Sequence, residues 1–179
     1  MLNTLRLTAT AATIVVSAAG CATAEQPKMN DLEIAHTAYT AGNLDIRYAH
    51  MALAVSENPA VLDFARTMIR DHGAVNDEAV ALIGKLKVTP QDNPLSQALV
   101  KGAADKRAEF GRLSGKAFDC AYATNELGYH QVVNQTVAGT FIPQTTVPEL
   151  KQLLEGALAT FQAHEKHAGA MVKGLKCGA

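Results

Sequence analysis

The sequence predicts an all-helical protein, in which four long helices form one bundle and an additional short helix crosses over between the second and third. Alanine, leucine and valine dominate the composition, whereas aromatic residues make up 5% of the chain and tryptophan is absent. This composition favours helices, because sheets are enriched in β-branched and aromatic residues. Apolar residues also recur at alternating steps of three and four, the spacing of one helix face, and proline, asparagine and glycine separate the periodic segments.

The length and charge of the chain limit its organisation and its partners. Residues 25–179 are the size of one domain with a single core, so a second domain is not expected. The 16 Lys and Arg residues nearly balance the 17 Asp and Glu residues, and neither sign gathers into a stripe. A nucleic-acid partner is therefore not expected, because nucleic-acid-binding surfaces carry clustered positive charge.

Residues 1–24 have the features of an export signal. Arg6 precedes an apolar stretch from Leu7 to Ala19, and small residues follow at 22–24, a pattern typical of a signal peptide. A transmembrane helix needs about 20 apolar residues, more than this stretch offers, and no later segment qualifies. We therefore predict a protein of the periplasm or cell envelope whose mature part, residues 25–179, has no transmembrane segment.

Two processing routes remain open for this segment. Cleavage after Ala24 would release a soluble domain. Alternatively, residues 17–21 resemble a bacterial lipobox, in which case residues 1–20 are removed and Cys21 carries a lipid tether. Ala18 stands where a lipobox usually has a bulky residue, which argues against the tether.

Two long helices are predicted at the start of the mature domain. The first covers residues 30–57 and presents the apolar stripe Leu32, Ala35, Tyr39, Gly42, Ile46, Ala49 and Leu53. The Asn58–Pro59 pair then begins the second helix, because proline fits the first helical turn, and this helix runs to about Lys87. One histidine interrupts its inward stripe, which consists of Val61, Ala65, Met68, His72, Val75, Ala79, Leu82 and Leu86.

A short crossover helix is predicted from Pro94 to about Leu113, after a loop that begins at Val88. We place its end before Ser114–Gly115, because an unbroken helix from Pro94 to Thr140 would be about 70 Å long, much longer than its neighbours.

Two further long helices complete the predicted bundle. One covers residues 116–139, and after a loop at Pro143 the last begins near Pro148 and ends near Gly174. The last helix presents the stripe Leu150, Leu154, Ala157, Phe161, His164, Ala168, Met171 and Leu175. Four long helices with a longer connection between the second and third have the connectivity of a ferritin-like bundle.

Four sequence patches, in their order and spacing, resemble the bacterial family catalogued as domain of unknown function 4142 (DUF4142). They are residues 68–72, residues 117–122, His130 and residues 164–168. The resemblance extends from about Asp31 to Leu175 and implies a ferritin-like, exported protein without an established biochemical activity. Cys120 departs from the family, in which Arg commonly follows the preceding Phe-Asp pair. This departure puts a charge pair at that point in doubt and leaves room for a disulfide.

Cys120 and Cys177 are the two cysteines that follow the signal segment. In an oxidising compartment they could pair across 57 residues, which the chain-entropy model values at ~4 kcal/mol. Alternatively, both remain free thiols and Cys120 is a small apolar residue of the core.

A candidate metal site follows from the heights of three histidines along the bundle. His72 lies 13 residues after Pro59, and His130 lies 14 residues after Lys116. If these two helices run parallel, both histidines lie within ~2 Å of one level. Glu126 is one turn from His130 on the same face, and His164 of the antiparallel last helix comes near the level of Glu126. Three imidazoles and a carboxylate suit Zn, Cu, Ni or Fe.

Other interpretations of these residues are simpler. Each histidine can be hydrogen-bonded within the core instead of binding a metal, and Asp71 can either orient His72 or be a surface charge. A di-iron oxidase needs two Glu-x-x-His motifs, but Glu33–His36 alone has this spacing, about 12 Å below His72. The sequence also lacks serine-hydrolase, phosphate-loop and Cys-x-x-Cys motifs, so we do not expect an enzyme.

Two hypotheses about function remain. In the first, the bundle binds or buffers a transition metal in the cell envelope through His72, Glu126, His130 and His164. In the second, it is a structural or protein-interaction module in which the same histidines are satisfied internally.

Overall fold

A computed structural model of the chain describes residues 28–178. The predicted signal peptide, residues 1–24, and the candidate lipidation site Cys21 lie outside the described residues. The elements are α1 (Asp31–Val55), α2 (Pro59–Leu86), α3 (Pro94–Phe110), α4 (Gly115–Thr136), the π-helix η1 (Val137–Phe141), α5 (Ile142–Gln144) and α6 (Pro148–Gly174). Among the described residues, no helix combines the length and the apolar character needed to cross a membrane.

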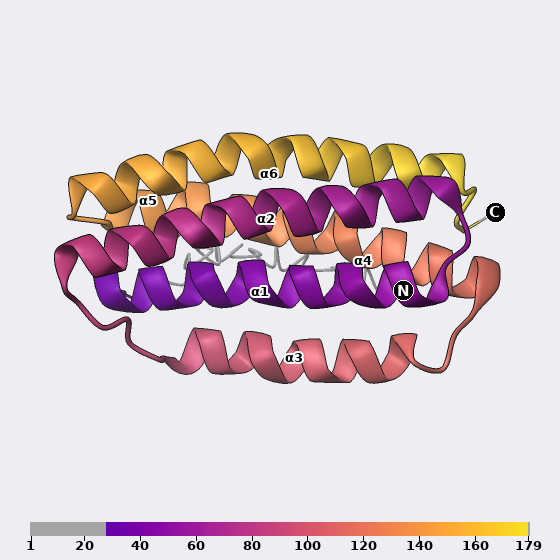
Figure 1. Ribbon diagram of the computed structural model, residues 1–179, viewed down its shortest axis with the longest axis horizontal. Helices are drawn as coiled ribbons and strands as arrows, with labels where there is room; N and C mark the ends of the chain where they lie inside the picture. The colour runs from indigo at the N-terminus through magenta and orange to yellow at the C-terminus, as the bar shows by residue number, and fades with distance from the viewer. Residues whose placement is uncertain (1–27, 179) are drawn as a thin grey trace, which may run out of the picture.

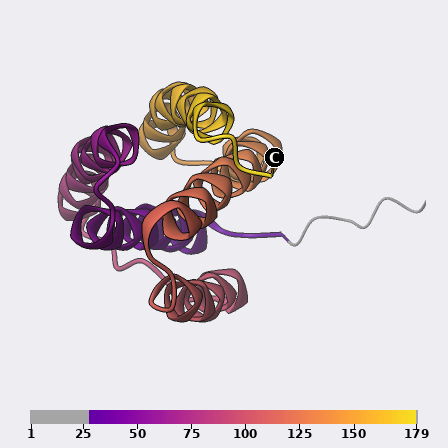
Figure 2. The same cartoon turned by 90° about the vertical axis from the view of Figure 1, so that its right-hand side faces the viewer.

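The long helices α1, α2, α4 and α6 pack around a common interior, and α3 lies outside them along α1 (Figures 1 and 2). Helices α2 and α4 run in one direction, whereas α1 and α6 run in the opposite direction. The parallel pair arises because α3 carries the chain back along the bundle before α4 begins. The predicted ferritin-like bundle with a short crossover helix is therefore confirmed.

Asparagine side chains fix the starts of the first three helices. Asn30 accepts hydrogen bonds from the backbone N–H groups of Leu32 and Glu33, and the Glu33 carboxylate accepts one from the Asn30 N–H. This reciprocal arrangement is a capping box. Asn58 and Asn93 also cap α2 and α3 through their side chains, each followed by a proline in the first turn. An asparagine cap contributes about 1 kcal/mol, so these boundaries are determined locally.

Two predicted boundaries were wrong. The crossover helix ends at Phe110 instead of Leu113. The backbone also stays helical beyond Gly139, through η1 and α5 to Gln144, so the predicted loop at Pro143 does not form. Pro143 is tolerated because it lies in the first turn of α5, where its missing N–H is not needed.

The inward faces agree with the prediction on α6 but not on α1. On α6, every stripe residue from Leu150 to Met171 is buried. On α1, the stripe is displaced by about one residue, because Ile34, Asp45 and Tyr48 are buried whereas Tyr39 is 36% exposed. Helix α1 contacts α2, α3 and α4, so it is apolar over a broad arc, and the periodicity alone did not locate the centre of that arc.

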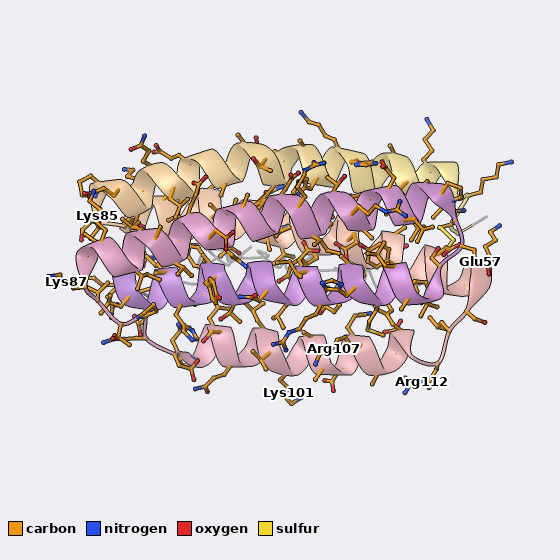
Figure 3. The ribbon with its side chains drawn as sticks, in the orientation of Figure 1. Glu57, Lys85, Lys87, Lys101, Arg107 and Arg112 are labelled. Atoms are coloured by element: carbon orange, nitrogen blue, oxygen red, sulfur yellow. A yellow bond between two sulfur atoms is a disulfide. The ribbon has the colours of Figure 1, made fainter. Side chains whose placement is uncertain are left out.

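The interior has two differently filled halves. The half near the α1–α2 connection is packed with aromatic rings, namely Tyr48, Phe64, Phe110, Phe118 and Tyr122. The opposite half is mainly aliphatic and contains Met29, Ile34, Val137, Phe141, Leu150 and Leu154. A cluster of polar side chains separates the two halves. Charged side chains such as Lys101 and Arg112 point away from the bundle (Figure 3).

Candidate metal centre

All four bundle helices contribute polar side chains to the middle of the interior. Asp45 comes from α1, His72 from α2, Glu126 and His130 from α4, and His164 from α6. Each of these side chains is buried, with exposed fractions between 0% and 3%. The structure thus brings together the four residues predicted from the sequence and adds a fifth, Asp45.

Asp45 lies at the centre of this cluster. Its Oδ2 is 2.9 Å from His72 Nε2 and 3.3 Å from His130 Nε2, so two imidazoles approach one carboxylate oxygen. The His164 ring centroid is 5.3 Å from those of both His72 and His130. One nitrogen from each of the three imidazoles lies within 4.8 Å of the other two. Nitrogens bound to one zinc ion at ~2.1 Å can be up to ~4.2 Å apart, so small side-chain shifts would bring all three onto one ion.

Most of the polar atoms that face this cluster have no hydrogen-bond partner in the structure. Within residues 28–178 these atoms are both carboxylate oxygens of Asp45, both ring nitrogens of His72, His130 Nε2, His164 Nδ1, Glu126 Oε2 and the Tyr122 hydroxyl. Asp45 gains a partner once Glu126 is protonated, because the Glu126 carboxyl can then donate a hydrogen bond to it. Buried polar atoms are nearly always partnered, and a buried atom without a partner calls for an explanation such as a bound ion or an ordered water.

The two buried carboxyl groups hold different charges. Burial raises the pKa of Glu126 well above its usual range, and the neighbouring Asp45 charge raises it further, so Glu126 keeps its proton. Burial also acts to raise the pKa of Asp45, but His72, His130 and the neighbouring Glu126 carboxyl together lower it below its ordinary value. Asp45 is therefore the anion of the site.

Two of the histidines are neutral near pH 7. Burial lowers the pKa of His130 against the opposing effect of the Asp45 charge. Burial also lowers the pKa of His164 to about 4, although Asp71 opposes the shift. A neutral imidazole has a free nitrogen lone pair, which is the form that binds a metal.

Hydrogen bonds to groups outside the cluster determine which ring nitrogen of His130 and of His164 carries that lone pair. His130 Nδ1 lies 2.9 Å from the backbone oxygen of Glu126, and His164 Nε2 lies 3.0 Å from Asp71 Oδ2. Both oxygens can only accept, so His130 Nδ1 and His164 Nε2 carry the protons. The lone pairs of His130 Nε2 and His164 Nδ1 are left free, in the arrangement commonly seen for metal-binding histidines.

Asp71 corrects one expectation from the sequence. Its contact is with His164 and not with His72, because Asp71 lies on the side of α2 that faces α6. Its carboxylate is also held by Arg70, with an Arg70 Nε to Asp71 Oδ1 distance of 2.7 Å.

The sequence prediction missed Asp45 because its α1 stripe was centred about one residue away. A signal was present, since Asp45 lies three and four residues before Tyr48 and Ala49 and so shares their face. Neither His36 nor His50 joins the cluster, because His36 lies 3.8 Å from Asp92 and His50 is exposed.

In the structure, Cys120 and Cys177 form a disulfide with a Cα–Cα distance of 5.3 Å. It links the first turns of α4 to the segment after α6, at the aromatic end of the bundle. The link holds the helices of His130 and His164 together at one end.

Two of three comparisons of the chain with known proteins found a match. No curated protein matches it. A solved structure described as "CopM in the Cu(II)-bound form" matches with a TM-score of 0.63 and 15% sequence identity, covering 83% of this chain and 99% of that chain. At this identity the similarity shows a shared helical-bundle fold. The model of a domain of unknown function, DUF4142, matches residues 16–171, and the chain therefore belongs to the DUF4142 family.

Proposed function

We propose that this protein binds one transition-metal ion in the cell envelope, through Asp45, His72, His130 and His164. One observation carries the proposal: nitrogens of His72, His130 and His164 lie within 4.8 Å of one another in the buried interior, and each ring has a nitrogen without a hydrogen-bond partner. Asp45 Oδ2 lies against two of these rings, 2.9 Å from His72 Nε2 and 3.3 Å from His130 Nε2. A purely structural polar cluster is expected to satisfy its buried atoms with hydrogen bonds.

The chemistry of the ligands favours a borderline divalent cation. Imidazole nitrogens combined with one carboxylate oxygen suit Zn, Cu, Ni and Fe rather than Mg or Ca, which prefer oxygen ligands. The anionic Asp45 offsets part of the charge of the ion inside the protein. Because a protein of the same fold has been solved with Cu(II) bound, Cu(II) is the first ion to test.

The number of protein ligands favours storage or buffering over catalysis. Catalytic zinc sites usually keep one position open for water or substrate, whereas four protein ligands close a tetrahedral site. The four proposed ligands come from four different helices, so binding would also clamp the bundle. We therefore assign no enzymatic activity to this site.

Isothermal titration calorimetry of the purified, metal-stripped protein with Cu(II), Zn(II), Ni(II) and Fe(II) tests the proposal. We expect one ion per chain for at least one metal, together with a higher melting temperature. His72→Ala and His164→Ala should abolish the binding, whereas His50→Ala, at an exposed position of α1, should leave it unchanged. Absence of binding for all four metals, or equal loss in all three variants, would refute the proposal.

A further inference from the structure

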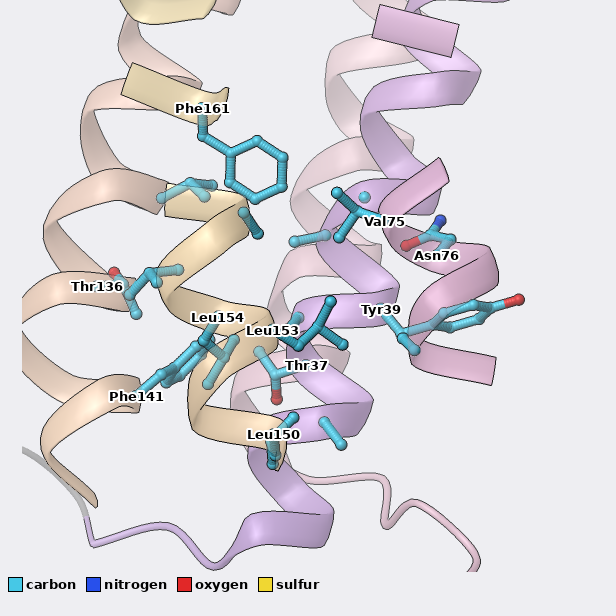
Figure 4. A pocket seen from close by; sticks show the side chains of 18 of the residues that line it. Thr37, Tyr39, Val75, Asn76, Thr136, Phe141, Leu150, Leu153, Leu154 and Phe161 are labelled. Atoms are coloured by element: carbon cyan, nitrogen blue, oxygen red, sulfur yellow. The ribbon is translucent and has the colours of Figure 1, made fainter. Parts of the chain in front are cut away.

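An apolar cavity of about 160 Å³ lies in the aliphatic half of the bundle. It lies beside the metal-ligand cluster, the four proposed ligands Asp45, His72, His130 and His164. Side chains from α1, α2 and α6 line it, including Thr37, Val75, Leu150 and Leu154 (Figure 4). His72 and Phe161, whose rings stack at 4.6 Å, form part of its inner wall. The cavity therefore lies within the aliphatic half of the interior, among the buried residues of that half.

Small side chains leave this space unfilled. Six lining residues have no side chain larger than a methyl group, namely Ala35, Ala38, Ala41, Gly42, Ala79 and Ala157. Protein interiors otherwise contain few voids larger than a water molecule. Apolar cavities of about this size stay dry and take up small apolar molecules.

The cavity is long and reaches the surface. Along α2 its lining extends from His72 to Leu86, a distance of about 20 Å at 1.5 Å per residue. Leu86 and Val88 line its outer end and are 36% and 38% exposed. A small volume spread over this length fits a linear chain better than a fused ring system.

One polar side chain of the lining has an unused hydrogen-bond donor. Asn76 is 8% exposed, and its Nδ2 has no hydrogen-bond partner. Asn76 is one helical turn after His72, so this donor lies near the inner end of the cavity. The Asn76 amide packs against Gly42, and a rotation of this amide toward the cavity would let Nδ2 donate to a ligand oxygen. Within the described part of the chain, no Lys or Arg lines the cavity to pair with an anionic head group, so a neutral oxygen fits best.

We propose that the cavity binds a linear aliphatic molecule with a neutral oxygen head group, such as a long-chain alcohol. The chain occupies the space among the small residues, and its head-group oxygen accepts a hydrogen bond from Asn76 Nδ2. This site shares the wall residue His72 with the proposed metal site, but its test uses metal-stripped protein, so the two proposals can fail independently.

Titration calorimetry with decanol and with decanoate measures this binding. Decanol should bind one molecule per chain, at least about tenfold more tightly than decanoate. Ala79→Leu and Ala157→Leu fill the cavity and should weaken decanol binding at least tenfold while keeping the helical circular dichroism spectrum. Ala74→Leu, at an exposed position of α2 that does not line the cavity, is the matched control and should bind normally. Asn76→Leu should lower the affinity about threefold to tenfold, the effect of one lost hydrogen bond.

Three results would overturn the proposal. These are no binding of decanol, equal binding by wild type and the two filled variants, and binding of decanoate as tight as that of decanol. The Ala79→Leu and Ala157→Leu variants must be folded for their decanol affinities to be compared with that of wild type. Because two different helices are substituted, a folding defect in one variant leaves the other to decide.

Discussion

Asp71 fixes the orientation of His164, because Asp71 Oδ2 lies 3.0 Å from His164 Nε2 and accepts a hydrogen bond from its N–H group. His164 Nδ1 is then free to face the metal-ligand cluster, where it has no hydrogen-bond partner. In the proposed metal site, Asp71 would therefore position the ligand His164. Asp71 itself is held by the exposed Arg70 side chain.

Asp71→Asn should lower metal affinity about 10-fold to 100-fold, the usual effect of removing a hydrogen-bond partner of a metal ligand. The asparagine amide no longer selects the His164 tautomer with its proton on Nε2. Titration calorimetry gives the affinity, and nitrogen chemical shifts of the ring report the tautomer. Asp77→Asn, at an exposed position of the same helix, is the control. Unchanged affinity in Asp71→Asn would exclude this role without affecting the proposed metal site.

Asp45→Asn should weaken metal binding at least about 100-fold, whereas Glu126→Gln should weaken it less than about tenfold. Asp45 is the anion that lies against both His72 and His130. Glu126 keeps its proton, so glutamine replaces one neutral group with another. Calorimetric titration of both variants distinguishes the two roles. Comparable losses would mean that Glu126 releases its proton and becomes a ligand.

Acid should destabilise the metal-free protein through His164. Its pKa is about 4 when folded, below the ordinary 6.5, so between these pH values the unfolded chain binds more protons than the folded chain. The free energy of unfolding contributed by this residue therefore falls as the pH drops from 6.5 to 4. Urea denaturation across this range should show a steeper loss for wild type than for His164→Gln. Parallel pH profiles would contradict the prediction.

Reducing the disulfide should lower the free energy of unfolding by ~4 kcal/mol, because the Cys120–Cys177 bond closes a loop with a sequence separation of 57. Urea denaturation with and without a reducing agent measures this loss. A Cys120→Ser/Cys177→Ser double variant should match the reduced wild type and should not respond to the reducing agent. A response in the double variant would show that the agent acts elsewhere.

The helical bundle and its order of helices could be predicted because both depend on local features. Asparagine caps and prolines mark where α1, α2 and α3 begin, and the α6 stripe follows directly from the helical period. The π-helix η1 could not be predicted, since the sequence around Gly139 gives no signal that the backbone continues as a helix past it.

The candidate site was predicted in part for the same reason. His72 and His164 interrupt apolar stripes, so the helical period alone points them inward. His130 was placed by its height, which matches that of His72 if the two helices run parallel. Asp45 was missed because α1 is apolar over a broad arc, and an error of one residue rotates a helix face by about 100°. Only packing against α2 and α4 shows that Asp45 faces inward.

The sequence by itself determined most of the residues that form helices, where most of those helices begin and which histidines lie on inward faces, because caps and periodicity act within a few residues. The tertiary structure decided which side chains meet, that Asp45 is charged while Glu126 is neutral, and that one half of the interior is hollow. These properties depend on distances between helices and on burial from water, and both arise only when the four helices pack together.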